Sequence, residues 1–543
     1  MLKGLLANVF RARVQGEAHR VAVRTLLEEG VSHARAERMP EAERAFLEVL
    51  RREPSNADAL NLLGLLAYRR THYDAALAYF DDALRSAGEV AEFHANRGLA
   101  LQDLGRAADA EAAFRRAIEL APDVQRYGAM LLFLLSQTGS TTPDELLAEH
   151  KRFAAAFVDA PPRAAFPAAR FADPGRRLRI GYLSGDFRMH AAAYFIEPLL
   201  AARDRAAFEV YCYQTVAETD DRTHRFRALA DHWEEVSARG DDDLVALIGA
   251  HEIDILVDLA GLTTGSRAAA LGRRPAPVQI SYLGYLATTG ARAIDYRITD
   301  ARADPPGIAD AWYTERLLRL PRSFWCFAPH ADMPAPLERA APDDGPIVFG
   351  AFNRLTKVRP EVLRLWGRLL AQVPDSELWI LDVTSDDAHG RVVGEVAAAG
   401  VVPERVKTWA RLPAAPFWDR IRRADIALDT FPYNGGATTC ECLWLGVPVV
   451  TRAGDMGFAR SGASILGAVG LEELVATCDE QYLDVAAGLA ADRPRLRAMQ
   501  RGLRERLRTS PLLDAAGFMR ELEAAYRTVW RDACGARAAA GGR

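Results

Sequence analysis

A glycine-rich turn after a short apolar segment has the clearest chemical potential in this sequence. We expect a strand at residues 426–428, then a loop with Asn434, Gly435 and Gly436, then a helix that begins near Ala437. Glycines allow a ligand to approach the backbone, and the free N–H groups of a helix N-terminus attract anions. The segment therefore predicts a diphosphate site, with an ordinary strand–helix turn as the alternative. It lacks the G-x-x-x-x-G-K-[ST] pattern of P-loop proteins.

Three side chains of the expected helix could serve the same site. The hydroxyl groups of Thr438 and Thr439 lie in its first turn, where they would add donors for a phosphate. Glu441 lies one turn inside the helix, where its carboxylate could accept hydrogen bonds from ribose hydroxyls. Together these residues predict a nucleotide diphosphate as the ligand.

Lys357 is the cation that we expect to serve this site. A strand is expected to end at Asn353 and a helix to begin at Pro360, which places Lys357 near the start of that helix. An ammonium group at this point can neutralise a departing diphosphate. A lysine that simply faces solvent is the alternative.

His190 and two loops are candidates for the opposite wall of the site. His190 follows an expected strand and could act as a general base, orient a hydroxyl group, or only cap a helix. Two turn-rich loops, which begin at Gly261 and Gly284, each follow a strand, and ordinary turns are the alternative for both. The residues expected to line the cleft from this side are Asp258, Gly261, Arg267, Gly284 and Tyr285.

The elements that must position these residues are alternating strands and helices. From residue 177 onward, short runs of Ile, Val, Leu and Tyr are mostly separated by segments rich in Ala, Leu and Arg. This rhythm is typical of parallel sheets covered by helices. We expect two Rossmann-like halves, residues 175–330 and 347–530, joined by a proline-rich linker at 331–346. Ligands of such sheets lie beyond the carboxyl ends of the strands, so a cleft between the halves is expected.

The first quarter of the chain has a different pattern, with a period of 34 residues. Glycine recurs at positions 30, 64 and 98, alanine at 42, 76 and 110, and phenylalanine at 46, 80 and 114. Small residues allow two helices to approach closely while the phenylalanine fills the space between them. The period and these residues predict three tetratricopeptide repeats at 23–124, an α-solenoid. An alanine-rich bundle is the alternative. A helix at 1–22, a helical connector at 125–174 and a flexible tail at 531–543 complete the expected organisation.

Composition excludes several classes of protein. The 543 residues include 68 Lys and Arg against 73 Asp and Glu, a formal net charge of -5, which argues against general nucleic-acid binding. The six cysteines have the spacing of neither a disulfide scaffold nor a zinc site, so we expect no bound metal. The N-terminal apolar run is too short for a membrane span, and a cytoplasmic protein is expected.

Over about residues 23–530, the chain resembles the protein O-GlcNAc transferase family and its SPINDLY-type O-fucosyltransferase branch, as a bacterial member. The motifs that carry the resemblance are GYLSGDFRMH, RPAPVQISYLGYLATTG, DYRITDARADPP, FNRLTK and DTFPYNGGATTCECLWLGVPVVT. The resemblance implies a GT-B fold and an inverting, metal-independent glycosyltransferase without a cofactor. Such an enzyme moves a sugar from a nucleotide diphosphate to Ser or Thr of a protein that the repeats help to bind.

The resemblance also implies individual roles. Lys357 matches the lysine that stabilises the nucleotide diphosphate, and Asn353 and Arg354 lie at the same donor-binding strand end. Glu441 matches the carboxylate near the ribose, and His190 matches a histidine proposed as the catalytic base. Thr438 and Thr439 lie in the diphosphate loop.

Four positions depart from the patterns of the family. Gly436 and Ala437 replace a histidine and a threonine of the animal enzyme, and Leu262 replaces a histidine of SPINDLY-type sequences. Phe417 stands where a histidine often packs near the nucleotide base; its ring could still stack on the base. The donor is therefore open: UDP-GlcNAc is favoured, GDP-fucose is the alternative, and so is a flagellin or surface-protein glycosyltransferase. A catalytically silent tetratricopeptide scaffold is the alternative from another class.

Overall fold

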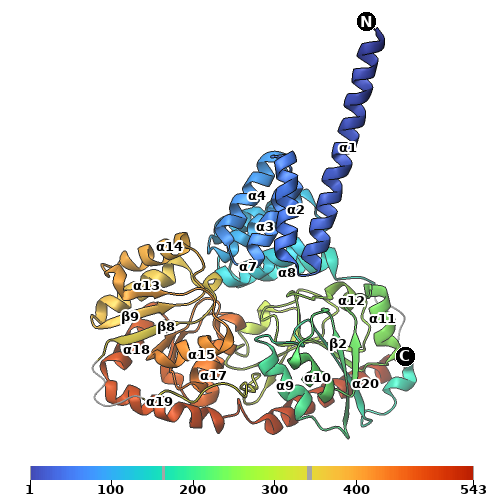
Figure 1. Cartoon of the computed structure of the whole chain (residues 1–543). Coiled ribbons are helices and arrows are strands. Elements are labelled where there is room, and N and C mark those ends of the chain that lie inside the picture. The colour runs from blue at the N-terminus through green and yellow to red at the C-terminus, as the bar shows by residue number, and fades with distance from the viewer. Residues whose placement is uncertain (1, 162–165, 339–344, 542–543) are drawn as a thin grey trace. The chain divides into compact units, whose positions relative to one another are not determined.

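The computed structural model describes residues 2–161, 166–338 and 345–541 (Figure 1). Contacts between residues divide the chain into two compact units. The first comprises Met1–Leu131 with Thr384–His389, and the second comprises Leu132–Val383 with Gly390–Arg543. Residues 339–344 of the expected linker lie outside the described residues. Within the residues that the structure describes, no helix combines the length and apolar character needed to cross a membrane.

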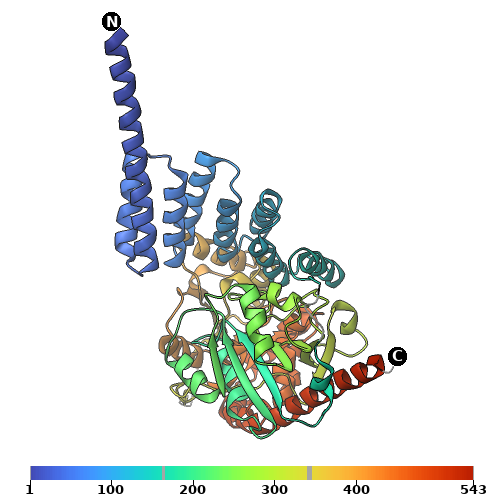
Figure 2. The same ribbon diagram turned by 90° about the vertical axis from the view of Figure 1, so that its right-hand side faces the viewer.

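The first unit is a row of antiparallel helices that lie side by side (Figure 2). Its helices are α1 (Leu2–Arg35), α2 (Met39–Arg52), α3 (Ala57–Arg69), α4 (Tyr73–Ala87), α5 (Ala91–Asp103) and α6 (Ala107–Leu120). Each expected repeat supplies one pair of them. The expected helix at 1–22 is not separate, because α1 continues without a break into the first repeat; the first proline of the chain is Pro40.

Glycine and phenylalanine meet in every pair of these helices. A Cβ atom built on Gly30, Gly64 or Gly98 would lie 2.3, 2.5 or 2.5 Å from the ring of the phenylalanine sixteen residues later. Those rings, Phe46, Phe80 and Phe114, are almost completely buried. Glycine at these positions is therefore a steric requirement of the helix packing.

Two helices connect the repeats to the sheets. Helix α7 (Gln125–Thr138) is followed by α8 (Pro143–Phe157), which begins with a capping box between Thr142 and Glu145. Helix α8 packs on the sheet region of the second unit through His150. The imidazole Nδ1 of His150 donates to the carbonyl of Leu146, and its Nε2 accepts from the hydroxyl of Tyr285 at 2.6 Å.

Among the described residues, the first sheet has seven parallel strands in the order β3-β2-β1-β4-β5-β6-β7. They are β1 (Leu178–Ser184), β2 (Phe208–Gln214), β3 (His232–Glu235), β4 (Ile255–Asp258), β5 (Val278–Ser281), β6 (Tyr296–Asp300) and β7 (Arg316–Leu320). Its helices include α9 (Ala193–Ala201), α10 (Asp221–Leu229), α11 (Asp241–Ala250) and α12 (Ala268–Gly272). The strand order reverses between β1 and β4, which makes this edge a ligand-binding position in Rossmann-like sheets.

The second sheet repeats this arrangement with six described strands in the order β10-β9-β8-β11-β12-β13. They are β8 (Ile347–Ala351), β9 (Ser376–Ile380), β10 (Val406–Thr408), β11 (Ile426–Leu428), β12 (Val449–Arg452) and β13 (Val475–Ala476). Its helices are α13 (Pro360–Gln372), α14 (Asp386–Ala397), α15 (Ala414–Arg423), α16 (Ala437–Trp444), α17 (Ser461–Val469), α18 (Asp479–Ala491) and α19 (Arg493–Arg508). Its order reverses between β8 and β11. The two Rossmann-like halves of the predicted GT-B fold are thus present.

The last helix, α20 (Ala515–Gly541), returns to the first sheet (Figure 1). It packs against α9, β5 and β7, and the hydroxyl of Tyr526 lies 3.3 Å from that of Tyr182 in β1. Trp530 and Cys534 are buried one turn apart. These two contacts hold the chain helical beyond residue 531, where the sequence predicted a flexible tail, and the helix ends at Gly541.

Candidate active site

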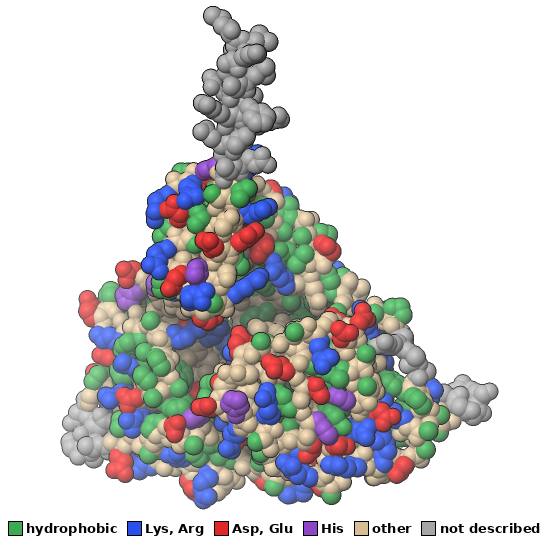
Figure 3. Space-filling view, turned by 45° about the vertical axis from the view of Figure 1, so that its right-hand side comes forward, with side chains coloured by type: hydrophobic (Ala, Val, Ile, Leu, Met, Phe, Trp, Pro, Cys, Tyr) green, Lys and Arg blue, Asp and Glu red, His purple; other side chains and the backbone are tan. Residues whose placement is uncertain are grey.

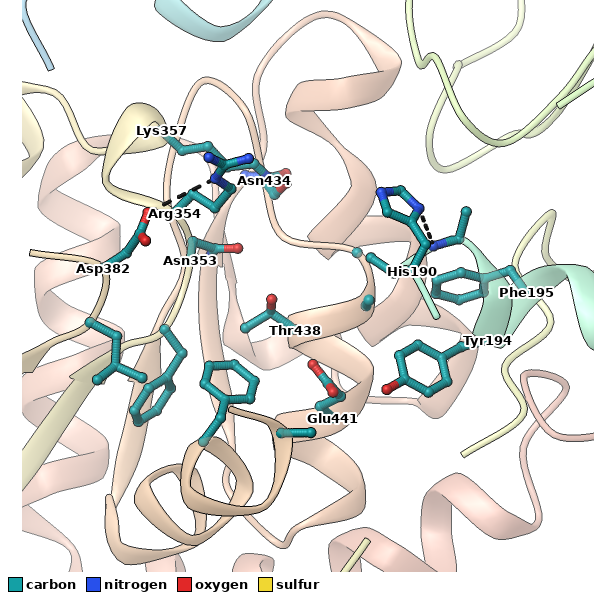
Figure 4. A pocket seen from close by; sticks show the side chains of 18 of the residues that line it. His190, Tyr194, Phe195, Asn353, Arg354, Lys357, Asp382, Asn434, Thr438 and Glu441 are labelled. Carbon is teal, nitrogen blue, oxygen red and sulfur yellow. Dashed lines mark hydrogen bonds and ion pairs between the residues drawn. The ribbon is translucent and has the colours of Figure 1, made fainter. Parts of the chain in front are cut away.

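A cavity of about 630 Å³ lies between the two sheets, within the second unit (Figure 4). His190, Tyr194 and Phe195 face it from the first half, and Arg354 and Asp382 face it from the second, with Thr438 and Glu441 between them. His190 follows β1, Asn353 follows β8, and the loop before α16 follows β11. The cavity therefore lies at the point of each sheet where the strand order reverses, as expected for a nucleotide site.

Most of the predicted site residues, whether catalytic, donor-binding, base-stacking or cleft-lining, line this cavity. They are His190, Gly284, Asn353, Arg354, Lys357, Phe417, Asn434, Gly436, Ala437, Thr438 and Glu441. Gly435 and Thr439 lie behind the wall instead, where the hydroxyl of Thr439 donates to the carbonyl of Gly435. Both help to shape the loop, and neither is among the lining residues.

Four residues predicted to line the cleft do not line it, because they maintain the local fold. The carboxylate of Asp258 accepts the N–H groups of Ala260 and Gly261, and Gly261 has a positive φ of 58°. Arg267 points away to Asp241, and Tyr285 is engaged by His150. Sequence reasoning placed their loops correctly after strands but could not say which way the side chains turn.

The loop before α16 is held by its own amide groups. The side-chain amide of Asn434 donates to the carbonyl of Thr430 at 2.8 Å, and its backbone N–H donates to the carbonyl of Phe458. Helix α16 begins without a side-chain cap, so the first N–H groups of the helix are available to an anion. Thr438 points into the cavity beside them (Figure 4).

The ammonium group of Lys357 lies beside the same loop, which precedes α16. Its Nζ donates to the carbonyl of Asn434 at 3.1 Å and lies 4.5 Å from the centre of the Tyr433 ring. No described carboxylate forms an ion pair with it. Burial lowers the pKa of Lys357 to about 8, and the attraction of Asp429 opposes this fall. A partly desolvated cation of this kind binds an anion strongly, since the anion restores its missing counter-charge.

Glu441 and a group of aromatic and aliphatic side chains form the next part of the cavity. The indole N–H of Trp418 donates to Oε1 of Glu441 at 2.9 Å, and Oε2 has no hydrogen-bond partner among the described residues. Burial raises the pKa of Glu441 to about 7. Phe352, Leu381, Leu412 and Phe417 line the cavity here and form a surface on which a base could stack.

His190 faces the cavity with one ring nitrogen already used. Its Nδ1 accepts the backbone N–H of Ala192 at 3.2 Å, so the neutral ring carries its proton on Nε2. The buried carboxylate of Asp186 lies 3.3 Å from the same Nδ1. Burial lowers the pKa of His190, and this carboxylate opposes the change. The neutral ring therefore offers a hydrogen-bond donor to the cavity.

Trp325 lies close to Gly436. A Cβ atom built on Gly436 would lie 3.2 Å from Cη2 of this indole, which is buried between Phe195 and Phe324. The φ of Gly436 is -112°, which any residue can adopt, so a larger residue here would meet only the close approach of the indole. Trp325, Trp418 and Tyr433 are site residues that the sequence reasoning missed. Trp418 directly follows the predicted Phe417, and this adjacency is the one signal that could have found it.

The model of glycosyl transferase family 41 matches residues 153–343 and 336–522, and a tetratricopeptide repeat model matches residues 27–87 and 64–124. The chain is 36% identical over 428 residues to a tomato (Solanum lycopersicum) protein named probable UDP-N-acetylglucosamine–peptide N-acetylglucosaminyltransferase SPINDLY. The match covers 77% of this chain and 45% of that protein. An Arabidopsis thaliana relative with the same enzyme name, called SEC, is 33% identical over 66% of this chain and 38% of its own length. The chain thus spans less than half the length of these relatives.

Among solved structures, a mutant of the Thermobaculum terrenum O-GlcNAc transferase is 37% identical, with a TM-score of 0.89. The match covers 95% of this chain and 99% of that one. The two-sheet arrangement and the repeats agree with the predicted GT-B and tetratricopeptide architecture. The chain therefore belongs to glycosyl transferase family 41 and carries tetratricopeptide repeats before its glycosyltransferase region.

Proposed function

We propose that this protein is an inverting protein O-glycosyltransferase that moves N-acetylglucosamine from UDP-GlcNAc to Ser or Thr of protein acceptors. The observation that carries the proposal is the cavity at the points where the strand order of both sheets reverses. Lys357 and the N-terminus of α16 lie on one side of it and His190 on the other. The names of the relatives support the donor and the peptide acceptor. The repeats would help to bind the acceptor protein.

The chemistry needs positive charge where the leaving diphosphate develops negative charge. The acceptor hydroxyl attacks the anomeric carbon, the bond from that carbon to the diphosphate oxygen breaks, and the hydroxyl proton passes to a phosphate oxygen of the departing diphosphate. The Lys357 ammonium and the first N–H groups of α16 stabilise the diphosphate as it leaves. Since these groups supply the charge, we propose that no metal ion or other cofactor is required.

In this scheme His190 orients substrate and does not remove the proton, because the ring nitrogen that faces the substrate already carries one. Its Nδ1 is occupied by the N–H of Ala192, so Nε2 carries the proton and donates to a sugar or acceptor oxygen. Glu441 accepts from the ribose through its free Oε2. The base of the donor rests on Phe417 and its apolar neighbours.

A panel of UDP-, GDP- and CDP-sugars tests the proposal by thermal shift. A ligand at 100 times its dissociation constant adds about 2.7 kcal/mol to stability, which is a readable shift. We expect UDP-GlcNAc to stabilise the protein and to serve as donor to a protein acceptor, equally in the presence of a metal chelator. A shift with GDP-fucose alone would favour the fucosyltransferase alternative. If none of them stabilises the protein, the result would favour the catalytically silent tetratricopeptide scaffold.

A further inference from the structure

A buried carboxylate lies directly behind the loop that precedes α16. Asp429 follows β11 and is 1% exposed. Its Oδ1 accepts the N–H groups of Thr430 at 2.9 Å and Gly435 at 2.7 Å, and the side-chain amide of Asn353 at 3.0 Å. Its Oδ2 accepts the hydroxyl of Thr451 at 2.7 Å. One side chain therefore joins the ends of β8 and β11, strand β12 and the loop.

The surroundings of this carboxylate are built to keep it in place. A Cβ atom on Gly462, in the first turn of α17, would lie 2.7 Å from Oδ2 of Asp429 and 2.3 Å from Oγ1 of Thr451. The backbone of α17 can approach only because residue 462 is glycine. The carboxylate is thus enclosed by backbone on one side and by the donor loop on the other.

The charge of Asp429 has no ion-pair partner among the described residues. This charge attracts the ammonium group of Lys357, which also forms no ion pair with a described carboxylate. The carbonyl of Asn434, in the loop that Asp429 holds, accepts from Nζ of Lys357. A hydrogen bond to the loop and an electrostatic attraction therefore both connect the carboxylate with the cation.

We propose that Asp429 is the positioning residue of the nucleotide-diphosphate site. It fixes Gly435 and Asn353 in the shape that receives the diphosphate, and its negative charge keeps the Lys357 ammonium protonated before the ligand arrives. This inference rests on the proposed function, because it assigns Asp429 to the same site.

The protonation states agree with this role. Burial raises the pKa of Asp429 to about 6, and the backbone N–H of Gly435 limits the rise, so the group is ionised at neutral pH. Arg354, on the loop beside Lys357, lowers the pKa of Lys357, and Asp429 opposes it. The other titratable groups that face Asp429 are Tyr482, whose hydroxyl donates to the Asp429 carbonyl, and Cys442 in α16.

Substitution Asp429→Asn keeps the size of the side chain and removes its charge. The test measures the affinity of UDP-GlcNAc and GDP-fucose by calorimetry between pH 6.5 and 9, with the full chain. For the wild type we expect constant affinity at low pH and a decline above the pKa of Lys357, about 8. For the variant we expect the affinity at pH 7.5 to be about tenfold lower than that of wild type. We also expect its decline to begin about one pH unit below that of wild type. A purely structural role would not move this midpoint.

Asp425→Asn is the control for loss of a buried carboxylate, because Asp425 is equally buried immediately before the same strand, β11, but is paired with Arg497 and does not line the cavity. We expect it to leave the affinity and the midpoint unchanged. Should Asp429→Asn fail to fold, Thr451→Val removes only the donor to Oδ2. Loss of this hydrogen bond makes the ionised form of Asp429 less stable. We therefore expect a smaller loss of affinity than in Asp429→Asn, about threefold.

An unmoved midpoint in Asp429→Asn would overturn the inference whatever its affinity, and so would unchanged binding by Thr451→Val if the first variant is unfolded. If the wild type binds neither nucleotide sugar at any pH, the proposed function fails instead. The two failures are therefore distinguishable.

Discussion

Replacing Lys357 by methionine keeps most of the apolar length of the side chain and removes its charge. In the unliganded site the pKa of Lys357 falls from 10.5 to about 8, mainly by burial. This fall corresponds to at most about 3 kcal/mol of cost for the charge, because one pKa unit is about 1.36 kcal/mol and the residue is partly exposed. Because the variant avoids this cost, it should unfold at a higher temperature. Because it lacks the cation, it should bind the donor more weakly.

The sign of the stability effect follows from the protonation states. A lysine whose pKa is lower in the folded state destabilises that state while it is charged, below pH 8. The penalty fades as pH rises from about 8 towards 10.5. We expect Lys357→Met to be more stable than wild type at pH 7, with the difference shrinking towards pH 10.

The catalytic effect should be larger than the effect on stability. Loss of a donor that stabilises charge in the transition state costs about 10²–10³-fold in kcat. The assay measures release of the nucleotide diphosphate from UDP-GlcNAc with a protein acceptor, together with melting curves. Lys407→Met is the control, because Lys407 is exposed on β10 and is not among the residues that line the cavity. Turnover by Lys357→Met within threefold of wild type would refute the assignment.

Two further predictions concern helix packing and a buried hydrogen bond. Gly64→Ala brings a Cβ atom 2.5 Å from the Phe80 ring, so we expect a loss of about 1–3 kcal/mol in circular-dichroism melting. Gly488→Ala, also in a helix but with nothing within 4 Å of the new atom, should be neutral or stabilising; equal effects would contradict this reasoning. Tyr285→Phe leaves the buried Nε2 of His150 without a donor, so denaturant unfolding should show a loss of about 1–3 kcal/mol, and unchanged stability would argue against that hydrogen bond.

The net charge of -5 does not indicate which ligand the protein binds, and the structure shows why. Lys and Arg are interspersed with Asp and Glu over the face shown in Figure 3. A site for a diphosphate requires only a local cation and a helix terminus, which Lys357 and α16 supply. A mildly acidic chain can therefore carry an anion site.

The sequence by itself determined the features that depend on one segment at a time. The period of 34 residues predicted the repeats, because each unit must place glycine opposite phenylalanine to pack its own two helices. Strand runs that end in glycine-rich loops predicted the donor loop and the start of α16, because backbone geometry follows local residue types. Family motifs placed Lys357, Thr438 and Glu441 at the same site.

The tertiary structure alone decided which side chains from distant segments meet. The contact of Trp325 with Gly436, the engagement of Asn353 by Asp429, and the return of α20 to the first sheet leave no periodic trace in the sequence. Each depends on how two sheets and their loops pack, and close packing selects partners by shape and hydrogen bonding over all segments at once. For the same reason, Arg267 turned away from the cavity although its loop follows a strand, as predicted.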